Sequence, residues 1–102
     1  MKHYACRLSE LADGEVRALD LGPLHLILVR RGERVYCLEG YCTHEDFDLA
    51  HGLLLEDSIV CTRHLSQFLL ETGEVLNPPA ERPLKVYKVI REDDDLFIEV
   101  EE

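Results

Sequence analysis

Tryptophan is absent from this chain, methionine occurs once, and no apolar run is long enough to span a membrane. The longest apolar runs, such as Leu26–Val29, have the length of a strand, and the first residues lack the apolar core of a secretory signal. Basic residues are also scarce, because 11 Lys and Arg face 21 Asp and Glu and leave a formal charge of −10. That charge repels nucleic acid and anionic membrane surfaces. We therefore expect a cytoplasmic protein with neither as a partner.

The length of the chain excludes several classes of enzyme. With 102 residues and no internal repeat, low-complexity tract or linker, the sequence predicts a single domain over residues 1–102. A two-domain enzyme, an oxygenase with its own catalytic domain and a flavin reductase are all larger. A hydrophobic content of 46% predicts that the chain folds around a core.

Alternating β-branched and aromatic positions predict an all-β fold, whereas helical periodicity is nearly absent. About eight short strands at regular spacing are typical of a β-sandwich or a small barrel. A turn or two of helix is expected only in Glu45–His51, and prolines make Asn77–Pro83 an exposed loop. The expected strands are Met1–Leu8, Gly14–Leu21, Leu24–Arg30, Arg34–Glu39, Ser58–Thr62, Ser66–Glu71, Leu84–Arg91 and Leu96–Glu101.

Two short motifs carry the chemistry of the sequence. Cys42-Thr43-His44 follows one expected strand, and Cys61-Thr62-Arg63-His64 ends another. Each motif offers one thiolate and one imidazole, so two loops that meet would form a four-ligand metal site. In a reducing compartment, metal binding is a better interpretation of such cysteines than disulfides.

A structural zinc site is the alternative for these ligands, since Zn²⁺ also binds two cysteines and two histidines. Zinc fingers favour one pair of cysteines and one pair of histidines, which is not the spacing here. The other thiols, Cys6 and Cys37, lie in apolar strand patterns and are expected to be buried and inert. His3, His25 and His51 are interpreted as surface or sheet residues.

The ligand spacing resembles that of the Rieske-type [2Fe–2S] ferredoxins, which have a C-x-H motif followed by C-x-x-H. The similarity extends over roughly residues 36–90 and includes Gly52, Phe68, Thr72-Gly73, Pro78-Pro79 and Pro83–Tyr87. It implies stacked antiparallel sheets, with a two-loop cluster-binding subdomain over about residues 40–83. It also implies one [2Fe–2S] cluster, with the buried iron on Cys42 and Cys61 and the outer iron on His44 and His64.

Departures from the family pattern refine this expectation. Respiratory members have two further cysteines where this chain has Phe47 and Arg63, which favours the ferredoxin branch. The usual C-P-x-H-G of the second loop lacks its proline and glycine here, and we expect Leu65 to cover part of the cluster. Around the ligands, Ser66 matches a serine that hydrogen-bonds a sulfide in high-potential members. Phe68 replaces their tyrosine, and the loop at Pro78 forms a third side of the cluster tip.

The resemblance implies a one-electron carrier rather than an enzyme. It predicts a monomer that passes electrons from an NAD(P)H-dependent flavoprotein reductase to a terminal oxygenase. We expect brief electrostatic docking at the histidine tip, beside Glu45, Asp46 and Asp48 and the opposing charge of Arg63. The alternative within electron transfer is a small Rieske-like subunit of a larger reductase such as nitrite reductase.

Overall fold

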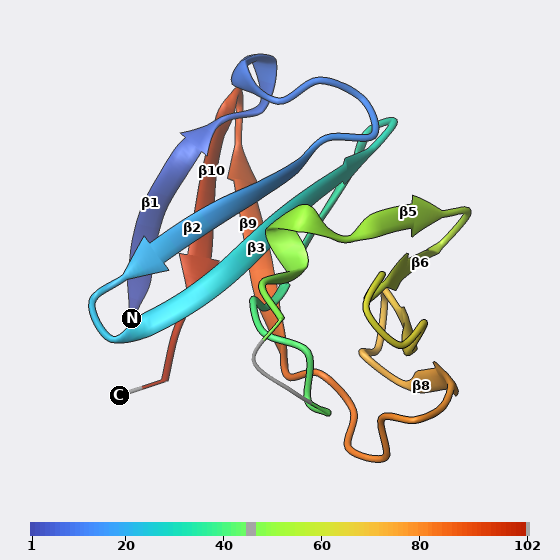
Figure 1. Cartoon of the computed structure of the whole chain (residues 1–102). Helices are drawn as coiled ribbons and strands as arrows, with labels where there is room; N and C mark the ends of the chain where they lie inside the picture. Colours follow the sequence, from blue (N-terminus) through green and yellow to red (C-terminus); the bar gives the residue numbers. More distant parts are fainter. Residues whose placement is uncertain (45–46, 102) are drawn as a thin grey trace.

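The computed structural model describes residues 1–44 and 47–101, and in these ranges strands and loops are interrupted only by two short 3₁₀ turns. Two antiparallel sheets form the molecule (Figure 1). The larger sheet has the strand order β1-β10-β9-β4-β3-β2. Its strands are β1 (Lys2–Arg7), β2 (Val16–Leu21), β3 (Leu24–Arg31), β4 (Arg34–Glu39), β9 (Val86–Glu92) and β10 (Asp95–Glu99). The all-β prediction is therefore confirmed.

The larger sheet curls around a core of its own. Side chains from β1, β3, β4 and β10 form this inner core: Cys6, Leu26, Leu28, Cys37, Leu96 and Ile98, with Leu8, Leu11 and Val100 beside them. Tight turns close its hairpins, as at Gly32, whose φ of +63° between β3 and β4 suits a residue without Cβ. The two termini lie side by side, and the Met1 ammonium donates a 2.6 Å hydrogen bond to the Val100 carbonyl.

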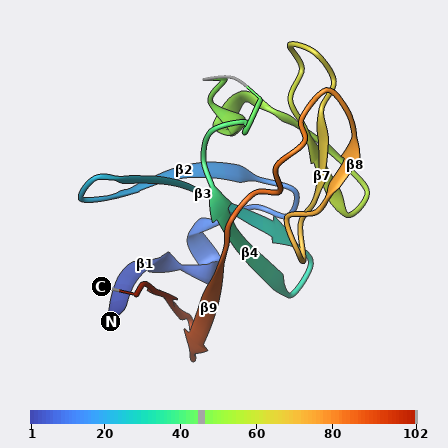
Figure 2. The same ribbon diagram turned by 90° about the horizontal axis from the view of Figure 1, so that it is seen from below.

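The smaller sheet lies on the other face of β3 and β4, away from the termini (Figure 2). Its strands, in the order β5-β6-β7-β8, are β5 (Leu53–Leu55), β6 (Ser58–Val60), β7 (Gln67–Leu69) and β8 (Val75–Asn77). Strand β3 is covered on both faces: Leu26 and Leu28 face the inner core, whereas Ile27 and Val29 pack under the small sheet. This double covering explains why Leu26–Val29 is a continuous apolar run instead of an alternating one.

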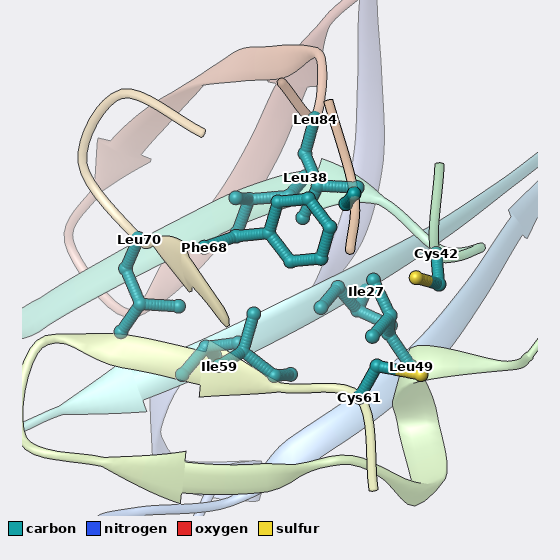
Figure 3. Packing of buried hydrophobic residues seen from close by; sticks show 11 residues of the cluster. Ile27, Leu38, Cys42, Leu49, Ile59, Cys61, Phe68, Leu70 and Leu84 are labelled. Atoms are coloured by element: carbon teal, nitrogen blue, oxygen red, sulfur yellow. The ribbon is translucent and has the colours of Figure 1, made fainter. Parts of the chain in front are cut away.

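A second core between the sheets supports the ligand loops. Phe68 and Ile59 of the small sheet meet Ile27 and Leu38 of the large one (Figure 3). Cys42 and Cys61 belong to the same cluster and lie at one end of it. The first predicted ligand of each loop therefore packs against side chains of both sheets.

The structure adds local elements that the sequence did not predict. All eight expected strands are present. Strands β5 and β8 were missed: they are as short as β6 and β7, but they lie at the two edges of the small sheet and most of their residues are exposed. The helix expected in Glu45–His51 is reduced to the 3₁₀ turn η2 (Leu49–His51), while Glu45 and Asp46 lie outside the described residues. A second 3₁₀ turn, η1 (Leu8–Glu10), was not expected.

The proline segment differs in part from its prediction as an exposed loop. Its first residue, Asn77, still belongs to β8, and Ala80 is only 3% exposed. The Ala80 N–H donates a 3.0 Å hydrogen bond to the Ser66 hydroxyl, which holds this part of the segment against the core. No helix within the described residues is long and apolar enough to cross a membrane.

Candidate metal centre

The first ligand loop, which carries Cys42 and His44, connects the end of β4 at Glu39 to the start of η2 at Leu49. Its two ends are joined by hydrogen bonds from the Cys42 N–H to the Phe47 carbonyl (3.0 Å) and from the Leu49 N–H to the Gly40 carbonyl (2.7 Å). Thr43 ties the loop to the proline segment, because its hydroxyl donates a 2.5 Å hydrogen bond to the Arg82 carbonyl. The loop is therefore held at its base and on one side.

The second ligand loop is a tight turn between β6 and β7. The Cys61 N–H donates to the Ser66 carbonyl and the Leu65 N–H donates to the Cys61 carbonyl, both at 2.8 Å. Leu65 has a φ of +65°, the left-handed conformation that glycine adopts most readily. Leu65 stands where the resembled C-P-x-H-G pattern has glycine, and a residue with a Cβ adopts this conformation at a cost of about 1–2 kcal/mol. The Leu65 side chain is 60% exposed at the tip.

The four predicted ligands come together as two pairs. Cys42 and Cys61 are 4% and 1% exposed, and their side chains interact with each other. His44 and His64 are exposed, with ring centroids 5.6 Å apart and ring planes at 84°. The cysteine pair therefore lies in the core and the histidine pair at the surface, as the sequence led us to expect.

The surroundings of Cys42 and Cys61 disfavour a free thiolate and favour one that binds a metal. Burial raises the pKa of the Cys61 thiol, and contact with Cys42 raises it further. The backbone N–H groups of Arg63 and His64 act in the opposite direction, since they donate hydrogen bonds to the Cys61 sulfur. A positive metal ion would resolve this conflict by stabilising both thiolates in the core.

The segregation of the two pairs fits a two-metal centre better than a single zinc ion. A tetrahedral zinc site needs all four ligands at one point. Within residues 1–44 and 47–101, no three His, Cys, Asp or Glu side chains converge closely enough to hold one ion. A buried pair of thiols and an exposed pair of imidazoles are instead the donor set of a Rieske cluster, in which two cysteines bind one iron and two histidines the other.

The other residues predicted near the ligands occupy different positions. Ser66 is fully buried, and because its oxygen accepts the Ala80 N–H, its own proton is available for donation. Phe68 is fully buried in the core below the cysteines. Pro78 is exposed, and its neighbour Pro79 lines a shallow depression that also contains His44. The proline segment thus forms a side of the tip.

Of the three acidic residues predicted at the tip, the structure describes Asp48. Asp48 does not face solvent freely, because its carboxylate accepts hydrogen bonds from the Ala50 N–H (3.0 Å) and the His25 ring (2.9 Å). Glu45 and Asp46 lie outside the described residues. Near the tip, the Arg82 guanidinium pairs with Glu39 at 3.2 Å. Asp48 is therefore half-buried and paired with His25, and its contribution to electrostatic docking stays a prediction.

His25 is a residue of the site that the sequence analysis missed. His25 lies on β3, in agreement with its interpretation as a surface or sheet residue, and its ring lies below the first ligand loop, where it contacts Tyr41 and Asp48. One signal was available: Asp20 and His25 flank the Gly22-Pro23 turn, a spacing that makes them cross-strand neighbours. The bond to Asp48 had no sequence signal.

The two remaining thiols were predicted correctly. Cys6 and Cys37 are buried in the inner core of the large sheet. Burial raises the pKa of the Cys37 thiol to about 12 and also raises that of Cys6. Both side chains therefore remain protonated, packed and unreactive at neutral pH.

Comparisons with known proteins agree with this geometry. A family model described as "Rieske [2Fe-2S] domain" matches residues 1–88. The 3-phenylpropionate/cinnamic acid dioxygenase ferredoxin subunit of Escherichia coli (strain K12) is 34% identical over 100 residues, which cover 97% of this chain and 93% of the relative.

Solved structures show the same architecture over nearly the whole chain. The ferredoxin of carbazole 1,9a-dioxygenase from Nocardioides aromaticivorans IC177 superimposes with a TM-score of 0.91 at 25% identity, covering 96% of both chains. A chain from a complex of reduced oxygenase and oxidized ferredoxin in carbazole 1,9a-dioxygenase superimposes with a TM-score of 0.90 at 28% identity, covering 95% of this chain and 91% of that one.

Proposed function

This chain belongs to the Rieske [2Fe-2S] family, and from that premise we propose that Cys42, His44, Cys61 and His64 hold its cluster. Each loop gives one cysteine to the inner iron and one histidine to the outer iron. The proposal is supported by the burial of the two cysteines in one core and by the 5.6 Å separation of the two exposed histidine rings. The two-loop unit corresponds to about residues 40–83 of a single Rieske-type domain over residues 1–102.

The proposed role is that of a one-electron carrier rather than an enzyme. When bound, the cluster gains and loses one electron at a potential that imidazole ligation raises into the range of about −150 to +300 mV. The chain's own residues bury the thiolates, donate N–H groups to Cys61 and expose the imidazoles of His44 and His64. No cavity for an organic substrate is needed for this role.

The proposed partners are an NAD(P)H-dependent flavoprotein reductase and a terminal oxygenase of a ring-hydroxylating system. The matched relative is the ferredoxin subunit of such a dioxygenase, and a solved relative was captured with its oxygenase. The two ferredoxin relatives are 34% and 28% identical to this chain, whereas a solved chain described as a putative nitrite reductase small subunit is 16% identical, which favours a ferredoxin over a small subunit of nitrite reductase. The observation that carries the proposal is the exposure of the histidine pair, because electrons then need to cross little protein to reach a partner.

The docking surface is the tip formed by the two ligand loops and the proline segment. It exposes Leu65, the two histidines and Arg82, on a chain whose formal charge is −10. We infer a transient complex in which long-range charge attraction speeds the encounter and a small apolar contact permits release. A cytoplasmic monomer is consistent with this exchange between two partners.

Reconstituted electron transfer tests the proposed function. With a purified reductase and oxygenase of a ring-hydroxylating system, NAD(P)H-dependent turnover should require this protein. The rate should fall as salt rises, since exposed charges are screened beyond about 8 Å at physiological ionic strength. A cluster-loaded protein that neither component reduces or reoxidises would contradict the carrier role.

The Ser66 hydroxyl is predicted to raise the reduction potential. Ser66→Ala removes a buried donor beside the ligands, so direct voltammetry should give a lower potential than in the parent. It also leaves the buried Ala80 N–H without its acceptor, which should cost about 1–3 kcal/mol of unfolding free energy.

Ser58→Ala is the matched control for this experiment. Ser58 is a buried serine of β6 whose hydroxyl donates a 2.7 Å hydrogen bond to the Leu55 carbonyl and accepts one of 2.6 Å from the Gln67 side-chain amide. Ser58→Ala should lose a similar amount of unfolding free energy, and its reduction potential should equal that of the parent. Equal potentials for Ser66→Ala and the parent would show that the Ser66 proton points away from the cluster.

A further inference from the structure

His25 joins three segments of the molecule through one imidazole ring. Its Nδ1 lies 2.6 Å from an Asp20 carboxylate oxygen on β2, and its Nε2 lies 2.9 Å from an Asp48 carboxylate oxygen at the start of η2. The Tyr41 ring lies against it, with ring centroids 4.6 Å apart. Tyr41 precedes Cys42, and Asp48 follows the loop that carries His44. The ring therefore touches both ends of the first ligand loop.

The backbone is shaped to admit this ring. The Gly40 N–H donates a 2.8 Å hydrogen bond to the His25 carbonyl, which brings the start of the loop against β3. A Cβ at Gly40 would come within 2.4 Å of the His25 ring and 2.8 Å of its carbonyl oxygen. Only glycine permits this approach, so residue 40 and the imidazole form one packed unit.

The hydrogen-bond partners of the His25 ring favour its protonated form. Both nitrogens face carboxylate oxygens, and an ionised carboxylate only accepts hydrogen bonds. A neutral imidazole has one N–H and would leave a lone pair against a carboxylate, whereas the imidazolium donates to both. The hydrogen bond to Asp48 is the largest of the effects that raise the pKa of His25, and Asp20 adds to it, together outweighing the effect of burial.

Other charged and titratable groups lie near the His25 ring, but its two nitrogens face Asp20 and Asp48. A shallow groove beside the ring contains Glu39, Arg82, Lys85 and Tyr87, of which Glu39 pairs with Arg82. On the other side, His51 of η2 faces Asp48. Asp20 is 72% exposed, whereas Asp48 is 32% exposed and also accepts the Ala50 N–H. Asp48 is therefore the main partner of the ring.

We propose that protonated His25 is a positioning residue that clamps the two ends of the first ligand loop, so that the loop's hold on the cluster weakens when the imidazole loses its proton. The inference rests on the proposed function, because the cluster is what the loop holds. The ligand loop thereby gains a pH dependence that originates outside the four ligands.

The direction of the pH dependence follows from the two pKa shifts. A group whose pKa is raised on folding stabilises the fold fully below its unfolded value and loses that effect as the pH rises through its folded value. For His25 the loss therefore occurs above 6.5, its ordinary pKa. Asp48 is the opposite case: partial burial opposes ionisation, but the hydrogen bonds from His25 and Ala50 lower its pKa, so its contribution is lost only in acid.

The test is the rate at which the cluster-loaded protein loses iron to a chelator, followed by visible absorbance between pH 5.5 and about 9. The parent rate should rise as His25 deprotonates. Glutamine cannot be protonated, so His25→Gln should lose iron about tenfold faster than the parent at pH 6, equivalent to about 1.4 kcal/mol. Its rate of iron loss should also lack the rise that deprotonation of His25 causes in the parent. Asp48→Asn keeps a side chain that can cap η2 but lacks the charge, so the midpoint should move to lower pH.

Controls separate the clamp from general destabilisation. His51→Gln replaces a nearby exposed histidine and should follow the parent profile, while Asp20→Asn should shift the midpoint less than Asp48→Asn. If His25→Gln fails to fold, the asparagine variants still report on the clamp. Parent-like profiles in the foldable His25 and Asp48 variants would overturn the inference.

A second readout does not depend on the cluster. Titration of the histidine rings by NMR should give a His25 pKa above 6.5 that falls in Asp48→Asn. A parent protein without iron and sulfide would contradict the proposed function, yet this titration would still confirm or overturn the charged clamp. A His25 pKa at or below 6.5 in the parent would overturn it.

Discussion

His64→Ala is expected to purify without visible colour and with much less than the parent's iron and acid-labile sulfide. The substitution removes one of two imidazoles at the outer position and leaves the loop between β6 and β7 otherwise intact. Because binding of a metal centre is coupled to folding, loss of the cluster should also remove much of the stability. Absorbance, iron and sulfide assays and thermal unfolding measure the two effects on the same sample.

His51→Ala is the matched control for this loss. His51 is an exposed histidine of η2, close to the first ligand loop in sequence but not among the four proposed ligands. It should retain parent levels of iron and sulfide. If His64→Ala also retained them, His64 would not be a ligand and the assignment of the outer pair would be wrong.

Phe68→Ala should cause the largest loss of stability among core substitutions of this chain. Phe68 is fully buried and packs between the two sheets, beside Leu38, Ile27 and the ligand cysteines. Truncation of a buried phenylalanine costs about 3–5 kcal/mol, through lost transfer free energy and the cavity that remains. That is a large part of the roughly 5–15 kcal/mol that holds a typical domain folded. Urea unfolding should show a lower midpoint, with weaker cluster retention.

Phe97→Ala provides the comparison for Phe68→Ala. Phe97 lies on β10 of the larger sheet, is partly exposed, and contacts Tyr4 and Lys2 near the surface. Phe97→Ala should cost less unfolding free energy than Phe68→Ala and leave the iron content unchanged. Equal losses at the two positions would mean that the core below the ligand loops relaxes to fill the cavity.

Much of the fold could be predicted from local pattern. Strands of five residues or more show alternation or a continuous apolar run, and their turns are marked by glycine, as at Gly32. Strands β5 and β8 were missed because they are mostly exposed edge strands whose position depends on pairing with β6 and β7. The burial of Ala80 likewise depends on a tertiary hydrogen bond, to Ser66, that no local pattern encodes.

The candidate ligands could be proposed from the sequence because their chemistry is local, whereas the residues that support them could not be predicted. Cysteine and histidine at fixed spacing within one short loop indicate metal binding from the sequence alone. The sequence alone does not distinguish Asp48 from Glu45 and Asp46, the other two acidic residues near His44. Only the packing of η2 against β3 shows that its carboxylate turns toward His25.

The metal and sulfide content of anaerobically purified protein tests the central claim most directly. A Rieske cluster held by two cysteines and two histidines predicts a reddish-brown protein with about two irons and two acid-labile sulfides per chain and little zinc. One zinc per chain without sulfide, in both aerobic and anaerobic preparations, would contradict the account.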